Sequence, residues 1–469
     1  DWMMKMIVSE DDPYWGNDCA GMVYHGVKDT KWIDLATNPW DYDKKFGTDR
    51  VVLPPTYAAT FDFAACAAQA SRLWREFDEE YADKCLELAK NAYEAAYKNS
   101  VVWDVYEVKF DTFGYKYPYN VTAKNYFAPS FNYGGNCFSD KDVKDEAYWA
   151  ACELYAATDE RDYNDYLMSY FDGQLGTKAF EIPLKSKSSY FTDQFGVKQP
   201  EYTVTNGTLS LLLNPQVLTK EEFESIKTNI TETADDLYDI MHSEQNGMGV
   251  PYTTTEIIEY SGIGPSTRVY AYLEKSNAII INNALIMPYA YAVTGDVRYI
   301  NYAAESMDYI FGRNGLDFSY VTGYGEHSVE NVNHIYWGDP IDSAFPDAPD
   351  GVLASGANTA TIDAISGILG IYRAKCAPQR TYVDNYESYT TNAAGLEINA
   401  PFAAMAAYLS IRPFEHYDED VPTKDNTPSD TNDYPPIEII VLGDANCDGE
   451  VNMADAVLVL QAIANPNKY

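Results

Sequence analysis

Oxygen-bearing side chains recur at regular spacing near the C-terminus of this chain of 469 residues. Counted from Asp444, they occupy positions one, three, five, nine and twelve of a twelve-residue stretch, and Gly449 stands at position six, where the chain must turn sharply. Calcium is a hard ion that binds in a cage of oxygens, to which position seven adds a backbone carbonyl. The stretch therefore predicts a calcium loop of the EF-hand type; the alternative is an acidic turn without metal. The predicted ligands are Asp444, Asn446, Asp448, Glu450, Asn452 and Asp455.

The framework ahead of this loop is predicted to be helical. Apolar residues recur at helical spacing from Tyr57 to Phe77 and from Glu79 to Lys98. Few segments show the alternation that is typical of strands, so the succession of helices predicts an all-α array or toroid. Further helices are predicted at 145–157, 221–242, 276–294, 298–311, 359–374 and 399–411.

The composition changes after residue 412. Residues 413–436 contain five prolines among acidic and small polar residues, which predicts an extended acidic linker. A short apolar lead then enters the calcium loop. The predicted organisation is a helical domain at 1–412, a linker at 413–436 and a small C-terminal module at 437–469.

The charge of the chain excludes several classes of partner. There are 71 acidic and 33 basic side chains, for a net charge of −38. Binding to nucleic acid or to an anionic membrane needs a basic surface, so neither is expected. No apolar run is long enough to cross a bilayer. The seven cysteines are scattered and show neither a zinc spacing nor a disulfide framework.

The calcium loop, with Asp455 at position twelve and a short apolar helix behind it, resembles the first repeat of a dockerin module. The resemblance implies structural calcium, a cohesin of a scaffoldin as partner, secretion, and assembly in the cellulosome of an anaerobic bacterium. Dockerins normally carry two such repeats and this chain shows one, so cohesin binding is expected if the second repeat is restored. Loop positions ten and eleven, which help dockerins choose a cohesin, are Met453 and Ala454.

The large domain is similar to glycoside hydrolase family 9 through an ordered series of segments. They are Gly21–His25 with Asp29–Trp32, Pro54–Thr60, Asp145–Ala150, Asn282–Ala284, Tyr291–Asp296, Phe311–Asn314, Ser319–Gly325, Tyr382–Asp384, Tyr389–Asn392 and Asn399–Pro401. This resemblance implies an (α/α)6 barrel, here incomplete, and the activity of an inverting endo-β-1,4-glucanase. It also implies contacts of His25, Trp32 and Tyr389 with a β-1,4-glucan.

Two carboxyl groups perform inverting hydrolysis, one as general base and one as general acid. The Asp-Ala-Gly-Asp motif that holds the family's base is absent, so the chain is expected to be truncated at its N-terminus as well as its C-terminus. The general acid follows Tyr-x-x-Asn, and the matching residue is Ala393, whose methyl group has no proton to donate. If this segment is helical, Glu397 lies about one turn further and could replace the acid; a structural or solvated Glu397 is the alternative. Asp384 is kept as a site-shaping carboxylate.

Other family positions have changed as well. The Pro-His-His-Arg element that holds the sugar corresponds to Val332–Ile335, which keeps His334 and places Asn333 where the first His would stand. Trp337 is expected either to stack on sugar or to pack in the core. Asp145 and Glu146 match a pair that binds structural calcium in some members; the alternative is a pair of helix N-terminal acids.

Three replacements in two motifs predict weak or absent hydrolysis. One hypothesis is a cellulosomal endo-β-1,4-glucanase with little activity. The alternative is a catalytically dead β-glucan-binding or structural component of a cellulosome.

Overall fold

The structure is a computed structural model, and it describes twelve stretches of the chain. They are residues 1–29, 36–41, 50–97, 143–160, 162–163, 203–243, 248–252, 254–259, 267–373, 375–411, 414–417 and 421–424. Trp32 and the whole predicted calcium module at 437–469 lie outside the described residues.

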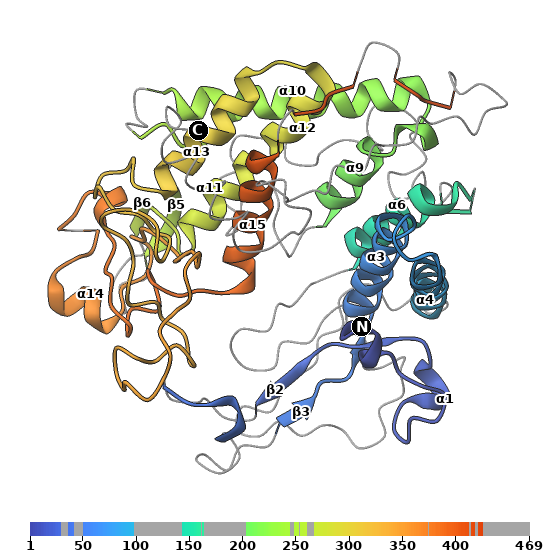
Figure 1. Ribbon diagram of the computed structural model, residues 1–469, viewed down its shortest axis with the longest axis horizontal. Helices are drawn as coiled ribbons and strands as arrows, with labels where there is room; N and C mark the ends of the chain where they lie inside the picture. Colours follow the sequence, from blue (N-terminus) through green and yellow to red (C-terminus); the bar gives the residue numbers. More distant parts are fainter. Residues whose placement is uncertain are drawn as a thin grey trace, which may run out of the picture.

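Helices dominate the described chain (Figure 1). They are α1 (Gly16–Cys19), α3 (Tyr57–Leu73), α4 (Glu79–Tyr97), α6 (Lys144–Thr158), α9 (Val204–Leu212), α10 (Lys220–Met241), α11 (Ser276–Ala284), α12 (Ile286–Thr294), α13 (Arg298–Ile310), α14 (Ala364–Leu369) and α15 (Leu396–Ser410). Short 3-10 helices are η1 (Met3–Met6), η2 (Pro39–Asp41), η4 (Pro215–Val217) and η5 (Pro378–Arg380). None of the helices among these residues combines the length and the apolar character needed to cross a bilayer.

Strands form only small antiparallel pairs in the described chain. β1 (Val23–Tyr24) pairs with β4 (Pro55–Thr56), β2 (Val27–Asp29) with β3 (Arg50–Val52), and β5 (Thr255–Glu259) with β6 (Thr267–Ala271). The β1–β4 pair leads directly into α3, and Thr56 caps that helix by accepting a hydrogen bond from the backbone of Ala59.

Neighbouring helices pack on one another around an arc (Figure 1). α3 packs on α4 and α6, α6 on α9, and α10 on α9 and α12. α13 packs on α12 and α11, and α11 packs on α15. α11 is buried along its whole length, as expected for an inner helix. This arrangement is consistent with the predicted (α/α)6 barrel.

Three predicted helices differ clearly from the observed ones. The helix predicted from Tyr57 to Phe77 ends at Leu73, and residues 74–77 form the turn that leads to α4. The helix predicted at 276–294 is divided into α11 and α12, because Pro288 has no N–H with which to bond the carbonyl of residue 284. The helix predicted at 359–374 is reduced to α14, which ends at Gly370 in the left-handed region with φ 71°. A residue without a side chain takes that conformation at little cost, and it stops the helix.

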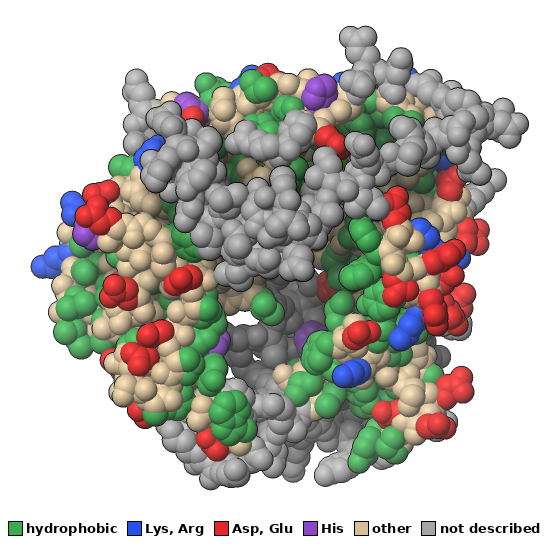
Figure 2. Space-filling view, in the orientation of Figure 1, with side chains coloured by type: hydrophobic (Ala, Val, Ile, Leu, Met, Phe, Trp, Pro, Cys, Tyr) green, Lys and Arg blue, Asp and Glu red, His purple; other side chains and the backbone are tan. Residues whose placement is uncertain are grey.

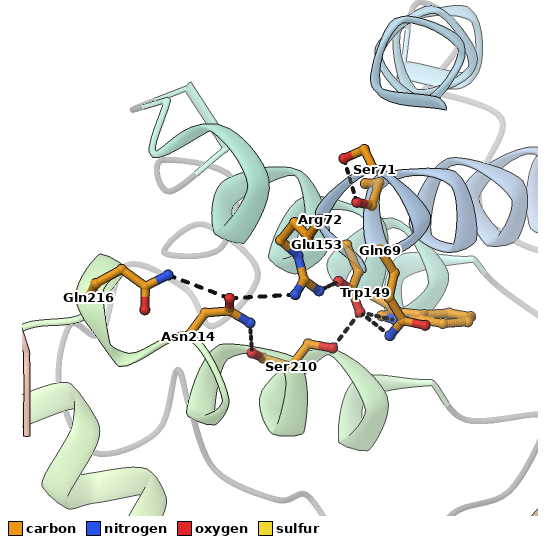
Figure 3. Close-up of polar contacts among 9 residues, drawn as sticks. Gln69, Ser71, Arg72, Trp149, Glu153, Ser210, Asn214 and Gln216 are labelled. Atoms are coloured by element: carbon orange, nitrogen blue, oxygen red, sulfur yellow. Dashed lines mark hydrogen bonds and ion pairs between the residues drawn. The ribbon is translucent and has the colours of Figure 1, made fainter. Parts of the chain in front are cut away.

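A buried ion pair joins three helices at the α3 side of the molecule (Figure 3). Glu153 of α6 is fully buried and pairs with Arg72 of α3. Its Oε1 also accepts hydrogen bonds from Gln69 at 3.1 Å, from the Trp149 indole at 3.2 Å and from the Ser210 hydroxyl of α9. Both carboxylate oxygens of Glu153 therefore have hydrogen-bond or ion-pair partners, which offset the loss of their hydration on burial.

The chain remains packed on the helical domain beyond α15. The backbone N–H of Tyr417 donates to the carbonyl of Ala292 at 2.7 Å. The ammonium of Lys424 lies 2.6 Å from a carboxylate oxygen of Asp159 and 2.5 Å from the hydroxyl of Tyr155. Burial would lower the pKa of Lys424, but these two hydrogen bonds outweigh burial and raise it. The described residues at 414–417 and 421–424 thus contact the helical domain, and the linker at 413–436 stays a prediction.

Candidate functional site

The segment that should carry the general acid lies beside the segment that should hold the sugar. Asn333 and Ala393 form a parallel β-bridge, in which the backbone N–H of Asn333 donates to the carbonyl of Asn392 at 2.8 Å. The carbonyl of Ala393 accepts hydrogen bonds from both the N–H and the hydroxyl of Ser355, each at 2.9 Å. Two residues that are 60 positions apart in sequence, Asn333 and Ala393, therefore meet. Ala393 is half-buried, and we call its position the acid slot.

Asp384 organises the backbone around the acid slot. Its carboxylate accepts the N–H of Glu330 at 3.0 Å, the N–H of Asn331 at 2.9 Å and the side-chain amide of Asn392 at 2.9 Å. The Asn331 side-chain amide adds a fourth contact at 3.3 Å. Because its acceptor capacity is spent on four N–H groups, Asp384 fixes the two chain segments that carry the site. The site-shaping role of Asp384 stays a prediction.

Asn333 and His334 are both held by neighbouring groups. The Asn333 amide donates one N–H to the carbonyl of Tyr386 at 2.6 Å, which leaves its oxygen and its second N–H for a ligand. The His334 ring stacks on Trp337 with centroids 4.0 Å apart, and burial lowers the pKa of His334. Because a lower pKa favours the neutral imidazole, the two stacked rings present an uncharged surface.

Aromatic rings line one side of this region. Trp40 is 63% exposed and makes an edge contact with Tyr336 at 6.0 Å between ring centroids. The backbone of Thr37 donates to the carbonyl of Ile335 at 3.0 Å, which ties the segment that carries Trp40 to the sugar-holding segment. Tyr389 is also exposed. Figure 2 shows a hollow in the middle of the drawn face, between the α3 side and the α15 side of the described residues.

Glu397 does not stand in the geometry that would let it replace the missing acid by helical spacing. Ala393 belongs to a β-bridge, and α15 begins only at Leu396, so the condition of a continuous helix is not met. The Glu397 carboxylate instead forms an ion pair with Lys275 at 2.9 Å. Lys275 precedes α11 with φ 62°, a conformation that costs energy in a residue with a side chain. This contact favours the structural alternative, and a catalytic role of Glu397 stays a prediction.

Asp363 supports the site and was not recognised from the sequence. Asp363 is buried and caps α14, and its Oδ1 accepts the backbone N–H of Ser366 at 2.7 Å. Its Oδ2 accepts the hydroxyls of Ser388 and Thr390, each at 2.7 Å. Burial alone would raise the pKa of Asp363, but the hydrogen bonds from Ser366, Ser388 and Thr390 outweigh burial and lower it. The Asp-x-x-Ser spacing before an apolar run was the available signal for the cap, and nothing local indicated the loop contacts.

A second layer of polar contacts holds the acid slot from behind. Asn277 in the first turn of α11 donates its side-chain amide to the carbonyl of Ala354 at 2.9 Å, and its backbone N–H to Ser355 at 3.0 Å. Gly356 lies against the Asn277 amide with φ 97°, and a Cβ at this position would come within 2.4 Å of it. Only glycine fits at position 356. The backbone conformation next to Ser355, which contacts Ala393, is therefore fixed by this residue type.

The other predicted site residues lie on different elements. The His25 ring is 3.1 Å from the hydroxyl of Thr56, at the start of α3. Asp145 and Glu146 are buried in the first turn of α6, where Asp145 accepts the backbone N–H of Thr203 at 2.9 Å. Among the described residues, no three His, Cys, Asp or Glu side chains gather where a metal ion could be held. The helix N-terminal alternative accounts for the position of the pair, and calcium there stays a prediction.

Comparison with known proteins identifies the family. A model of the family described as glycosyl hydrolase family 9 matches residues 1–406. The chain is 32% identical over 469 residues to a cellulose 1,4-beta-cellobiosidase from Acetivibrio thermocellus, covering 99% of this chain and 46% of that protein. It is 28% identical over 410 residues to endoglucanase C from Cellulomonas fimi, covering 87% of this chain and 31% of that protein. The chain thus spans less than half the length of these two relatives.

Solved structures agree in fold. A family 9 endoglucanase superposes with a TM-score of 0.62 at 21% identity, covering 86% of this chain and 61% of that one. A mutant of the thermostable endoglucanase from Alicyclobacillus acidocaldarius gives 0.62 at 23% identity, covering 87% and 63%. The family match over residues 1–406 and the shared fold confirm the resemblance: the chain belongs to glycosyl hydrolase family 9, a family of cellulases and endoglucanases.

Proposed function

We propose that this chain binds β-1,4-glucan in the cleft of a family 9 domain and hydrolyses it weakly or not at all. The observation that carries the proposal is the position of Ala393: it stands in register with Asn333, where the family's acid should stand, and its methyl group cannot donate a proton. General acid catalysis contributes roughly 10²–10⁴ in rate, so its loss alone would leave little turnover.

The surroundings of the acid slot support binding without chemistry. Asp384 and Asp363 still hold both walls of the site through hydrogen bonds, and aromatic rings are still presented by Trp40 and Tyr389. The carboxylate of Glu397 is engaged by Lys275. A site that keeps its framework and its apolar surfaces but lacks a proton donor fits a glycan-binding domain.

The test measures hydrolysis and binding on the same full chain. We expect reducing-sugar release from a soluble β-1,4-glucan at the level of the no-protein blank, together with measurable heat of binding for cellohexaose in titration calorimetry. Ala393→Glu is expected to leave the rate low, because Asn333 and Ile335 also replace groups that hold the sugar. Ala393→Gln serves as a control of the same size that has no acidic proton.

Two results would contradict this function. Fast turnover by the unaltered chain, rather than a rate at or barely above the blank, would show that another group, such as Glu397, supplies the proton. Failure of cellohexaose to bind would indicate a structural domain that has lost its ligand as well as its chemistry.

We also propose that the protein is secreted and that its C-terminal module, if a second dockerin repeat is restored, binds a cohesin in a cellulosome. The support is the donor set of the loop from Asp444 to Asp455, which supplies the oxygen ligands that calcium prefers. Calcium would have a structural role there, because it would gather the oxygen ligands of the loop.

Calcium binding by this loop can be measured directly. We expect calorimetric titration of the full chain with calcium to show a site that Asp448→Ala removes, because a central carboxylate ligand is lost. Asp11→Ala, an exposed aspartate at the other end of the chain, is the matched control. Unchanged calcium binding in Asp448→Ala would mean that the ion binds elsewhere on the chain. If the unaltered chain does not bind calcium, the alternative of an acidic turn without metal would be supported.

A further inference from the structure

Apolar side chains are exposed together at the turn between α3 and α4, at the end of α3 opposite to Thr56. Leu73 is 61% exposed, Trp74 49% and Phe77 74%. Trp74 makes edge contacts with Phe77 and with Tyr81, at 6.4 Å and 5.6 Å between ring centroids. We call these four side chains the turn patch.

The backbone beneath the turn patch is firmly held. The carbonyl of Trp74 accepts the N–H groups of Phe77 at 3.0 Å and of Asp78 at 2.8 Å. The Asp78 carboxylate accepts the N–H of Tyr81 at 2.9 Å and so caps α4. An ion pair of 2.5 Å between Arg75 and Asp83 crosses the turn. Rings presented on a fixed turn lose little conformational entropy when they bind, which favours recognition by a small number of contacts.

The surroundings of the turn patch are rich in carboxylates. Glu76, Asp78, Glu79 and Asp83 are all exposed next to the rings. Figure 2 shows acidic side chains gathered on this flank, over α4. Carboxylates accept hydrogen bonds from hydroxyl groups, and aromatic faces pack on apolar C–H surfaces. A neutral sugar polymer offers both kinds of group at once, whereas an anionic partner would be repelled.

The size of the turn patch also argues against a stable protein interface. Its three most exposed side chains present roughly 300–400 Å² of apolar surface, which is about half of what one partner buries in a standard protein complex. Apolar patches of this size on monomeric proteins often mark ligand sites. A glucan chain needs only a short row of contacts.

We propose that the turn patch is a second β-glucan-binding surface, separate from the cleft. The inference rests on the proposed function for the identity of its ligand. α3 has 17 residues, so its two ends are about 25 Å apart, and the patch lies at the end opposite to Thr56 and His25. A polymer held there would be kept at the surface of the domain while a different stretch of glucan occupies the cleft.

The experiment compares adsorption to an insoluble β-1,4-glucan with binding of soluble cellohexaose, using the full chain. The double variant Trp74→Ala/Phe77→Ala is expected to adsorb roughly five- to tenfold more weakly, because two ring contacts are lost. Its affinity for cellohexaose should stay within about twofold of the unaltered chain. Trp40→Ala should show the reverse pattern, since Trp40 lies beside the sugar-holding segment.

Trp2→Ala is the matched control, because Trp2 is 62% exposed on the N-terminal segment and lies outside both surfaces.

Equal adsorption of the double variant and the unaltered chain would overturn the inference. So would an unaltered chain that binds cellohexaose but not the insoluble glucan, and the proposed function would then survive. A dimer in solution that the double variant dissociates would identify the turn patch as a contact between copies. If the unaltered chain binds neither cellohexaose nor the insoluble glucan, the proposed function itself would be contradicted.

Discussion

Glu153→Ala is expected to lower the free energy of unfolding by about 3–5 kcal/mol. The carboxylate is fully buried, and it balances the charge of Arg72 while accepting hydrogen bonds from Gln69, Trp149 and Ser210. Alanine would leave the partly buried Arg72 cation and three polar groups without their acceptor, and these groups could recover full hydration only by opening the packing of α3, α6 and α9. Urea unfolding followed by far-ultraviolet circular dichroism measures the loss.

Two companion variants separate the charge effect from the general effect of removing a side chain. Glu87→Ala removes an exposed carboxylate from α4 and is expected to change stability by less than about 0.5 kcal/mol. The pair Arg72→Met/Glu153→Met removes both charges and fills part of the space, so it should be less destabilised than Glu153→Ala. A loss below about 1 kcal/mol in Glu153→Ala would mean that Arg72 finds water or another partner and that this cluster does not hold the three helices together.

Helices α4, α10 and α13 could be predicted from the sequence because each buries one recognisable face. The observed α4, α10 and α13 begin and end within one residue of the predicted ranges. α11 differs, since it is buried on all sides and its pattern does not show where it stops. The helix predicted at 359–374 was wrong in extent: α14 is held by the polar cap at Asp363, and its apolar side chains are largely exposed. In this segment, a high content of apolar residues does not mean that their side chains are buried.

The candidate site was predictable only where the family resemblance reached it. The family resemblance drew attention to Asn333 and Ala393 separately, but their meeting was not predicted, because no local periodicity links segments so far apart. The partners of Asp384 and Asp363 are backbone groups and hydroxyls, which any sequence contains, so spacing cannot reveal them. The ion pair of Glu397 with Lys275 depends on the packing of α11 against α15. Long-range contacts of this kind need the folded chain.

Asp363→Ala is expected to cost about 2–4 kcal/mol in stability and to weaken cellohexaose binding. The cap of α14 contributes about 1 kcal/mol, and the charged hydrogen bonds to Ser388 and Thr390 contribute the rest. Those two residues flank Tyr389 and lie just before the acid slot, so releasing them should disturb the sugar-facing loop. Thr219→Ala removes only a helix cap, on α10, and should cost about 1 kcal/mol without changing binding. Equal effects of the two variants would show that the loop contacts of Asp363 add nothing.

The pH dependence of Asp363 gives an independent test of the same contacts. Because hydrogen bonding lowers the pKa of Asp363 in the folded chain, folding favours the ionised carboxyl. Its contribution is fully present above the pKa of an unfolded aspartate, about 3.9, and is lost as the pH falls through the lower folded value. The stability difference between the unaltered chain and Asp363→Asn should thus be constant from about pH 7 to pH 5 and shrink below about pH 4. A difference that grows on acidification would mean that burial dominates and that the hydroxyls of Ser388 and Thr390 do not stabilise the charge.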